Sequence, residues 1–352
     1  MIYLNNAATS WPKPPSVLEA VTAALANPPV SPLRSSQSEQ PDVLTELRQR
    51  LGMLFHISDW QRIFFCSGAT DAANRVLQGI SWRSFSFSPD SHNSILRPLH
   101  NSIRTDGNGT YSLVALNHCS NVTGETASVE SECQKAHDEH ALLLLDASQS
   151  AGCIPIDVDE WGVDILVFTG HKGLLGPMGT GGYYVRRGID FKPAQFGGTG
   201  RDSRVVEYKD GDWEFEVGTQ NMPGLAGLKA GVDFVLEQGV DNIQRQEQQL
   251  ALWLIQELKA IPSVQLYTAA KPEAQGPVVS FNIKGLNPSD VGYILQNSYG
   301  ITVRTGLHCS PLVHKKLGTE RYGTVRVSLS CFTTLQDLQA LLQAVSAISN
   351  SL

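Results

Sequence analysis

The apolar and polar positions along the chain follow two different patterns. Between about residues 15 and 235, short apolar runs alternate with amphipathic helical stretches. The runs lack in/out alternation and end in polar or glycine residues, as at residues 62–69 (RIFFCSGA), 141–150 (ALLLLDASQS), 164–172 (DILVFTGHK) and 181–187 (GGYYVRR). Buried runs separated by helices are typical of a mostly parallel sheet with helices on both faces. This part of the sequence therefore predicts an α/β fold.

The pattern changes from about residue 241 onward. A long amphipathic helix is predicted first, followed by short apolar segments that suit strands and by a second helix. These elements are expected at residues 242–261 (helix), 264–268, 278–284, 290–299 (helix) and 324–330. The mixture predicts a smaller α+β domain with an antiparallel sheet.

Composition and charge narrow the class of protein. The 41% hydrophobic and 17% charged residues are typical of a globular protein, and the formal charge of −7 without a basic cluster argues against nucleic acid or an anionic membrane as a partner. The apolar runs are too short to span a bilayer, and no secretion signal is expected at the N-terminus. The cysteines show neither CxxC pairs nor metal-ligand spacing, which predicts reduced thiols in a cytoplasmic protein and no metal site. They are Cys66, Cys119, Cys133, Cys153, Cys309 and Cys331.

Polar residues follow three of the predicted strands, where open α/β sheets bind their ligands. Residues 67–70 (SGAT) open a predicted helix and suit a phosphate cradle, although they also suit a plain helix cap. Asp146 ends a buried strand and needs a partner. A protonated heterocyclic nitrogen would supply one, and the alternatives are an ion pair or a helix cap. Lys172 lies among glycines and could form a Schiff base, or it could be an exposed loop lysine. In this order, the three features supply the anion site, the acid and the amine that pyridoxal phosphate (PLP) requires.

Through these motifs, the sequence resembles the class V aminotransferase-like PLP enzymes of fold type I. Within that family it is most similar to the group II-like cysteine desulfurases and selenocysteine lyases. Further segments that carry the resemblance are YLNNAATSWPKPP, SHNSILRPL, NHCSNVTGE, EFEVGTQNMPG, RTGLHCSP and VRVSLS. The resemblance implies a large PLP-binding domain over residues 15–235, with a mostly parallel seven-stranded sheet flanked by helices. It also implies a small domain formed by residues 1–14 and the α+β part at 236–352.

The resemblance also implies roles for individual residues around PLP. Lys172 would hold the cofactor covalently, Asp146 would keep its pyridine nitrogen protonated, and His92 would stack on its ring. Asn121 and Gln149 would lie near its phenolate oxygen. The implied cofactor-binding residues are Ala69, Thr70, His92, Asn121, Asp146, Gln149, Thr169, His171, Lys172 and Thr219. Because Thr219 matches a residue that reaches the phosphate of the partner subunit, a homodimer is expected.

For the substrate, the resemblance implies desulfuration of L-cysteine to L-alanine. Arg326 would grip the substrate carboxylate, and Asn6, Ala7 and Arg304 would complete the substrate site. Lys172, Cys309 and His92 would be the catalytic residues, with Cys309 taking the sulfur as a persulfide and passing it to an acceptor protein or a small-molecule thiol. Three alternatives stay open: L-selenocysteine as substrate, another PLP-dependent C–S lyase or epimerase reaction, and a catalytically degenerate accessory protein.

The sequence departs from the family pattern at several positions. Asn5 stands where the family often has Asp, while Leu307 and Ser310 replace a frequent His and Ala beside Cys309. Residues 34–40 lack the usual Arg-Gly-x-His segment that lines the substrate entrance in relatives. His308 is a candidate thiolate partner for Cys309, but adjacent side chains on an extended loop need not face each other.

Overall fold

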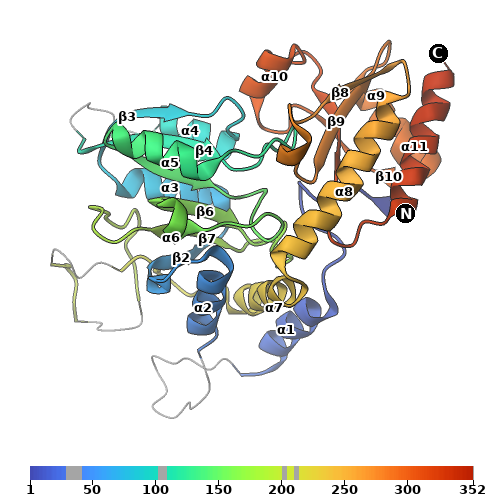
Figure 1. Ribbon diagram of the computed structural model, residues 1–352. Helices are drawn as coiled ribbons and strands as arrows, with labels where there is room; N and C mark the ends of the chain where they lie inside the picture. The colour runs from blue at the N-terminus through green and yellow to red at the C-terminus, as the bar shows by residue number, and fades with distance from the viewer. Residues whose placement is uncertain (29–41, 102–108, 200–203, 210–213, 352) are drawn as a thin grey trace.

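The computed structural model describes residues 1–28, 42–101, 109–199, 204–209 and 214–351. Within them the chain forms a large lobe around one central sheet and a smaller lobe that carries the C-terminus (Figure 1).

The sheet of the large lobe has the strand order β2-β7-β6-β5-β4-β3. Its strands run parallel to one another except β7, which is antiparallel to both β2 and β6. The strands are β2 (Ile63–Cys66), β3 (Trp82–Phe87), β4 (Tyr111–Asn117), β5 (Ala141–Asp146), β6 (Ile165–Thr169) and β7 (Gly181–Val185). This arrangement confirms the predicted α/β fold with a mostly parallel sheet.

The sheet differs from the prediction in strand number, because the described residues form six strands and not seven. β3 is the outermost strand, and the chain returns from it through helix α4 (Asn93–Asn101) to β4. Only residues 102–110 separate α4 from β4.

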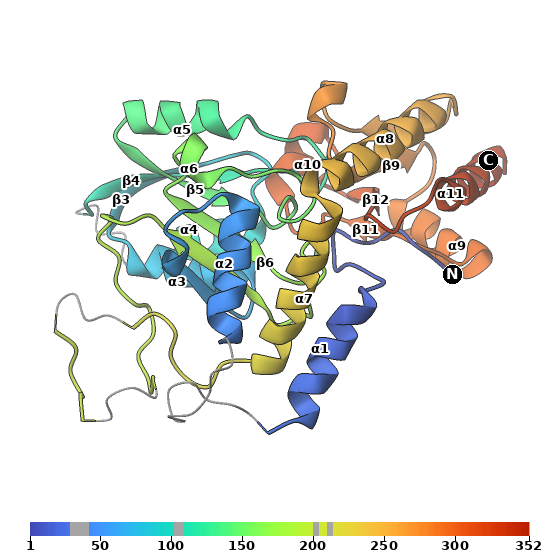
Figure 2. The same cartoon turned by 60° about the horizontal axis from the view of Figure 1, so that its bottom comes forward.

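Helices cover both faces of the sheet (Figures 1 and 2). The strand residues alternate between two apolar cores: Leu143 and Leu145 of β5 belong to one, Leu142 and Leu144 to the other. The first core includes α2 (Val43–Phe55), α5 (Val129–Asp138), α6 (Val158–Trp161) and α7 (Met222–Gln238), and the second includes α3 (Ala69–Gly79) and α4. Burial on both faces explains why the strands read as continuous apolar runs.

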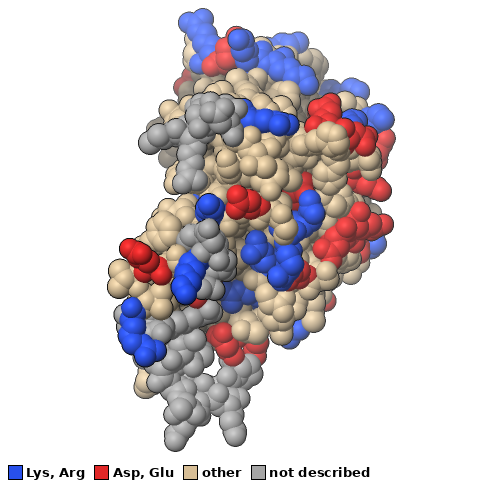
Figure 3. Space-filling model, turned by 90° about the vertical axis from the view of Figure 1, so that its left-hand side faces the viewer, with Lys and Arg blue, Asp and Glu red and all other residues tan. Residues whose placement is uncertain are grey.

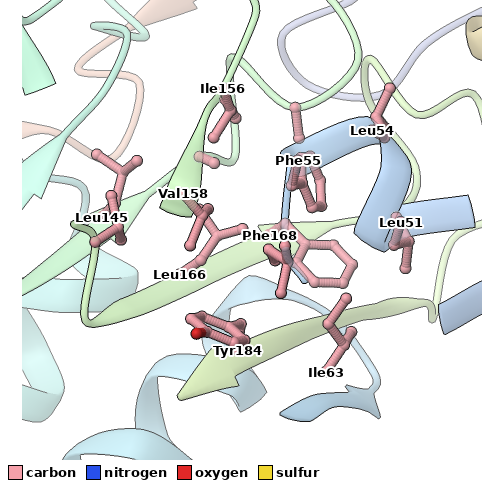
Figure 4. Packing of buried hydrophobic residues seen from close by; sticks show 14 of the residues in the cluster. Leu51, Leu54, Phe55, Ile63, Leu145, Ile156, Val158, Leu166, Phe168 and Tyr184 are labelled. Atoms are coloured by element: carbon pink, nitrogen blue, oxygen red, sulfur yellow. The ribbon is translucent and has the colours of Figure 1, made fainter. Parts of the chain in front are cut away.

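Aromatic packing fixes α2 against the sheet (Figure 4). Phe55 of α2 and Phe168 of β6 are fully buried, with ring centroids 5.5 Å apart, and Leu51 and Ile63 pack in the same cluster. Full burial of such a side chain contributes about 1.5–3 kcal/mol to stability. The short helix η1 (Trp60–Arg62) joins α2 to β2. This packing holds the end of β6 in place, and the strand leads directly into the segment that contains Lys172.

The smaller lobe contains an antiparallel sheet in the order β11-β12-β9-β8 and a separate apolar core. A long helix precedes the sheet, as the sequence predicts. The elements are α8 (Val240–Lys259), β8 (Val264–Tyr267), η2 (Pro272–Ala274), β9 (Val278–Ile283), α9 (Pro288–Tyr299), β11 (Arg304–Gly306), α10 (Pro311–Leu317), β12 (Thr324–Ser328) and α11 (Leu335–Asn350).

The N-terminal segment connects the two lobes. Its strand β1 (Ile2–Tyr3) pairs in parallel with β10 (Ile301–Thr302), and the following Leu4 is fully buried in the core of the smaller lobe. The Ser10 hydroxyl then donates a hydrogen bond of 2.8 Å to the Lys172 carbonyl. Helix α1 (Pro15–Ala26) packs against α7 of the large lobe.

Lys and Arg side chains lie among Asp and Glu side chains on the face seen in Figure 3. In the described part of the chain, no helix combines the length and the apolar character that crossing a bilayer requires.

Candidate active site

Polar side chains at the carboxyl ends of the strands line one cavity of about 380 Å³. Cavities of roughly this size typically hold small-molecule ligands. All but three of the predicted site residues line it, and the exceptions are Asn6, Thr219 and Cys309. The predicted residues that line it are Ala7, Ala69, Thr70, His92, Asn121, Asp146, Gln149, Thr169, His171, Lys172, Arg304 and Arg326.

The start of α3 lines this cavity and has the features of an anion site. Gly68 precedes the helix with a φ of 148°, a conformation that favours glycine, and no side chain caps the first turn. The backbone N–H groups of Ala69 and Thr70 have no hydrogen-bond partner among the described residues. His171 also lines the cavity, and its buried Nδ1 lacks a described partner as well. Free N–H groups at a helix N-terminus attract phosphate, so the plain-cap alternative does not describe this segment.

Asp146 presents one free carboxylate oxygen to the cavity. The side chain is 3% exposed, and its Oδ1 accepts hydrogen bonds from the Ser148 N–H at 2.9 Å and the Ser148 hydroxyl at 2.5 Å. Among the described residues, Oδ2 has no hydrogen-bond partner. A buried carboxylate oxygen needs a donor, and the protonated nitrogen of a pyridine ring would be one.

The buried environment of Lys172 suits an amine nucleophile. Burial lowers its pKa to about 8, although the negative charge of Asp146 opposes this shift. A sizeable fraction of the side chain is therefore neutral near pH 8, and the neutral amine is the form that attacks a carbonyl group.

His92 is held as a neutral ring. Burial lowers its pKa to about 4, and the positive charges of Lys172, Arg304 and Arg326 act in the same direction. Nδ1 accepts a hydrogen bond of 3.0 Å from the Ser94 N–H and lies 2.8 Å from the Ser94 hydroxyl, which assigns the ring proton to Nε2. A neutral imidazole in a fixed orientation suits stacking on a flat aromatic ligand.

Arg326 is a buried cation, and none of its partners in the described part of the chain is a carboxylate. It is 1% exposed, and burial lowers its pKa to about 9. Its Nη1 donates to the Asn121 carbonyl at 3.0 Å and its Nη2 lies 3.4 Å from Asn5 Oδ1, whereas Nε has no described partner. Because a buried charge is costly unless it is paired, the site fits a ligand that brings a carboxylate.

Cys309 lies on a loop with unusual backbone geometry. Both His308 and Cys309 adopt left-handed conformations, with φ of 50° and 60°. The thiol is exposed, and its Sγ lies 4.0 Å from Arg304 Nη2. His308 turns away toward Thr324, whose Oγ1 is 3.0 Å from Nε2, and burial lowers the pKa of His308 to about 2. The charged group beside the thiol is therefore Arg304, and His308 is neutral.

Comparison with known proteins places the chain in a family. Residues 2–105 and 100–341 match the family described as Aminotransferase class-V. The chain belongs to this family. It is 35% identical to a probable cysteine desulfurase of Methanothermobacter thermautotrophicus over 68% of this chain and 61% of that protein. It is 29% identical to a probable cysteine desulfurase of Halalkalibacterium halodurans over 97% of this chain and 91% of that protein.

Solved structures of related proteins share the fold of this class V family member. The structure of a cysteine desulfurase from Thermococcus onnurineus has a TM-score of 0.86 at 28% identity, covering 100% of this chain and 95% of that one. A cystine C–S lyase in complex with its product cysteine persulfide has a TM-score of 0.80 over 98% and 97% of the two chains, and its 23% identity supports likeness of fold alone.

Three predicted residues of this class V protein lie outside the main cavity. Asn6 donates from Nδ2 to the Ser328 carbonyl at 3.0 Å and lines a small internal cavity. Thr219 is exposed, and its contact with a second copy stays a prediction. Cys309 lines an adjacent cavity. The segment 34–40, where the family pattern is missing, lies outside the described residues.

Asn121 has a role that the sequence did not suggest. Its Nδ2 donates to the His308 carbonyl at 2.6 Å, and its Oδ1 accepts from the Ser310 hydroxyl at 2.7 Å. The side chain thus binds the loop on both sides of Cys309 while it also lines the main cavity. In the described structure, its amide group is engaged with this loop.

Two serines were missed by sequence reasoning: Ser148 orients Asp146, and Ser94 orients His92. Each follows its partner by two residues, a spacing at which side chains bond the backbone of a turn. That spacing is the signal that could have revealed them. Asn117 at the end of β4 also lines the cavity and binds Asp90 at 3.2 Å.

Proposed function

We propose that this protein is a PLP-dependent cysteine desulfurase, which converts L-cysteine to L-alanine and holds the sulfur on Cys309 as a persulfide. The observation that carries the proposal is the position of the Cys309 thiol. Its Sγ lies 4.0 Å from Arg304, and its loop is hydrogen-bonded to Asn121, which lines the main cavity. The names of the similar proteins support the same activity. L-Cysteine is the proposed substrate, and L-selenocysteine is the alternative.

The cavity residues fit PLP part by part. The N–H groups of Ala69 and Thr70, with Thr169 and His171, would hold the phosphate. Oδ2 of Asp146 would accept a hydrogen bond from the protonated pyridine nitrogen, and His92 would stack on the ring. When bound, PLP would supply the electron sink for the reaction, and Lys172 would be the residue that holds it.

The protein side chains would then divide the remaining work. Arg326 binds the substrate carboxylate with its planar guanidinium, which fixes the orientation of the amino acid. Lys172 in its neutral form takes the proton from the substrate α-carbon, because a base must be unprotonated to accept it. The Cys309 thiolate attacks the substrate sulfur, and the positive charge of Arg304 stabilises the negative sulfur. Cysteine and the free thiol become alanine and the persulfide, with no external oxidant.

The test is incubation of the PLP-loaded protein with L-cysteine and, separately, with L-selenocysteine. Alanine and a Cys309 persulfide, both measured by mass spectrometry, should appear in equal amounts in the first turnover. Cys309→Ala should abolish alanine formation from cysteine while the PLP absorbance band stays. Alanine production that persists in Cys309→Ala would exclude this mechanism, and elimination without alanine would indicate a C–S lyase.

We also propose a homodimer in which Thr219 reaches the phosphate of the second copy. The segment between β7 and α7 carries Thr219 together with exposed Phe196 and Val206, which are 66% and 89% exposed. The described parts of this segment extend away from the sheet in Figure 2. Apolar side chains exposed in this way favour burial against another surface. The cysteines are all free, which fits the reducing cytoplasm that we propose as the location.

The dimer can be tested by complementation. Thr219→Ala and Lys172→Ala proteins, unfolded together and refolded as a mixture, should form hybrid dimers with one complete site. Activity above that of either parent supports the shared site, whereas a mixture no more active than its parents would contradict it. The division into a large domain (residues 15–235) and a small domain (1–14 and 236–352) is likewise proposed, supported by the separate cores of the two lobes.

A further inference from the structure

A second cavity of about 460 Å³ adjoins the main cavity at the carboxyl ends of the strands. Both are lined by Thr70, His92 and Ser94, so they meet at the start of α3 and α4. Cys309 lines the second cavity and not the first. The exposed thiol therefore faces the second cavity, close to the residues that the two cavities share.

The walls of the second cavity have a distinct chemistry. They consist largely of the side chains of α3 and α4. Besides the hydroxyls of Thr70 and Ser94 and the imidazole of His92, the polar groups are four amides and one guanidinium: Asn74, Gln78, Asn93, Asn101 and Arg97. Arg97 is exposed, and its guanidinium forms no hydrogen bond or ion pair with the described residues. An unpaired guanidinium in a cavity of amides favours a ligand with a carboxylate and further hydrogen-bonding groups.

We propose that the second cavity binds a small, carboxylate-bearing thiol, which takes the sulfur from the Cys309 persulfide. This inference rests on the proposed desulfurase function, because the persulfide must form first. The volume lies within the range for small-molecule sites of about 300–1,000 Å³ and is too small for a folded protein. Arg97 binds the carboxylate and so directs the thiol of the acceptor toward Cys309.

The transfer needs no further reagent. The acceptor thiolate attacks the outer sulfur of the persulfide, forming a new S–S bond on the acceptor. The S–S bond to Cys309 breaks, and its electron pair leaves with Sγ as a thiolate. The hydrogen on the outer sulfur stays there, so a persulfide and a thiolate exchange places without net oxidation. Arg304, 4.0 Å from Sγ, stabilises the departing thiolate.

The experiment uses holoenzyme loaded with radiolabelled L-cysteine and then desalted. Release of label from Cys309 is timed with 3-mercaptopropionate, 2-mercaptoethanol or cysteamine at matched thiolate concentrations. The rate with 3-mercaptopropionate should saturate with concentration, and at low concentration it should exceed the rate with neutral 2-mercaptoethanol about tenfold. Arg97→Gln should remove this preference. Arg83→Gln, which changes an exposed arginine of β3 outside the cavity, should retain it.

The outcomes separate this inference from the function on which it rests. If no label appears on Cys309, the proposed function fails and this inference fails with it. If label appears but its release rises linearly with thiol concentration, or keeps the same preference in Arg97→Gln, the inference alone is overturned. Label that none of the small thiols releases would point to a protein acceptor and would also overturn it.

Discussion

The surroundings of Arg326 indicate which chemical group a ligand should bring to the site. Its guanidinium is buried, its neighbours offer only a carbonyl and an amide oxygen, and Nε has no described partner. Asn5 supplies the amide where relatives often have a carboxylate. Among the described residues no acidic side chain is hydrogen-bonded to it, so the guanidinium would be available for the carboxylate of the proposed substrate.

Replacing Arg326 should weaken the binding of the substrate without lowering the stability of the folded protein. Arg326→Gln should raise the KM for L-cysteine about 10- to 100-fold, because a hydrogen bond to a charged group contributes about 1.5–3 kcal/mol. The Tm should stay the same or rise, since an unpaired buried charge is removed. Steady-state kinetics and thermal melts measure both quantities. Arg321→Gln, at an exposed site, is the control. An unchanged KM would contradict the assigned role.

The proposed attachment of PLP to Lys172 should depend on pH. Its pKa is lowered to about 8, and only the neutral amine attacks the aldehyde. The rate at which the apoprotein attaches PLP should therefore increase as the pH rises from about 6.5 to 9, with a midpoint near 8. Visible absorbance follows the reaction, and Lys172→Ala should show no covalent band. A rate that is flat or falls over this range would disprove the assignment.

Among the connections between elements, the loop between β11 and α10 has an unfavourable backbone conformation. A non-glycine residue in the left-handed region costs about 1–2 kcal/mol, and His308 and Cys309 are two in succession. Three hydrogen bonds offset this cost: two to Asn121, and one of 2.8 Å from the Asn93 N–H to the Cys309 carbonyl. Ser310, which replaces a frequent alanine, supplies one of them.

Loss of the Ser310 hydroxyl should slow the sulfur transfer and leave the cofactor site intact. Ser310→Ala removes a neutral hydrogen bond that contributes about 0.5–1.5 kcal/mol, so persulfide formation should slow about 2- to 10-fold. Rapid-quench mass spectrometry measures this step, while the PLP absorbance should not change. Leu312→Ala on α10 is a control that leaves the Asn121 contacts in place. Equal rates in Ser310→Ala and wild type would show that the contact does not position Cys309.

At the scale of the whole molecule, Glu247 of α8 lies beneath the active site. It lines an internal cavity of about 30 Å³ together with Lys172 and Cys331, and its Oε2 has no described partner. Burial raises its pKa to about 8. The unfolded chain releases this proton near pH 4.5, whereas the folded protein keeps it up to about pH 8. The free energy of unfolding therefore falls as the pH rises through this window.

Glu247→Gln should remove this loss of stability. The amide cannot ionise, so the Tm of the variant should exceed that of the wild type by about 5–8 °C at pH 8.5 and match it near pH 5. Thermal melts across the pH range provide the measurement, and Glu237→Gln at an exposed site provides the control. If wild type and Glu247→Gln lose stability in parallel between pH 5 and 8.5, Glu247 is not the group responsible.

Sequence alone sufficed to predict the α/β class, the strand ends and the order in which Asp146 and Lys172 follow them. These features are local: an unbroken apolar run records burial on both faces, and a polar residue directly after it must lie at the sheet edge. Tertiary structure decided what depends on contacts between distant segments. Asn121 bonds to a loop far along the chain, His308 turns toward Thr324, and Cys309 opens onto the second cavity. No periodicity encodes such contacts, because they exist only once the two lobes have packed together.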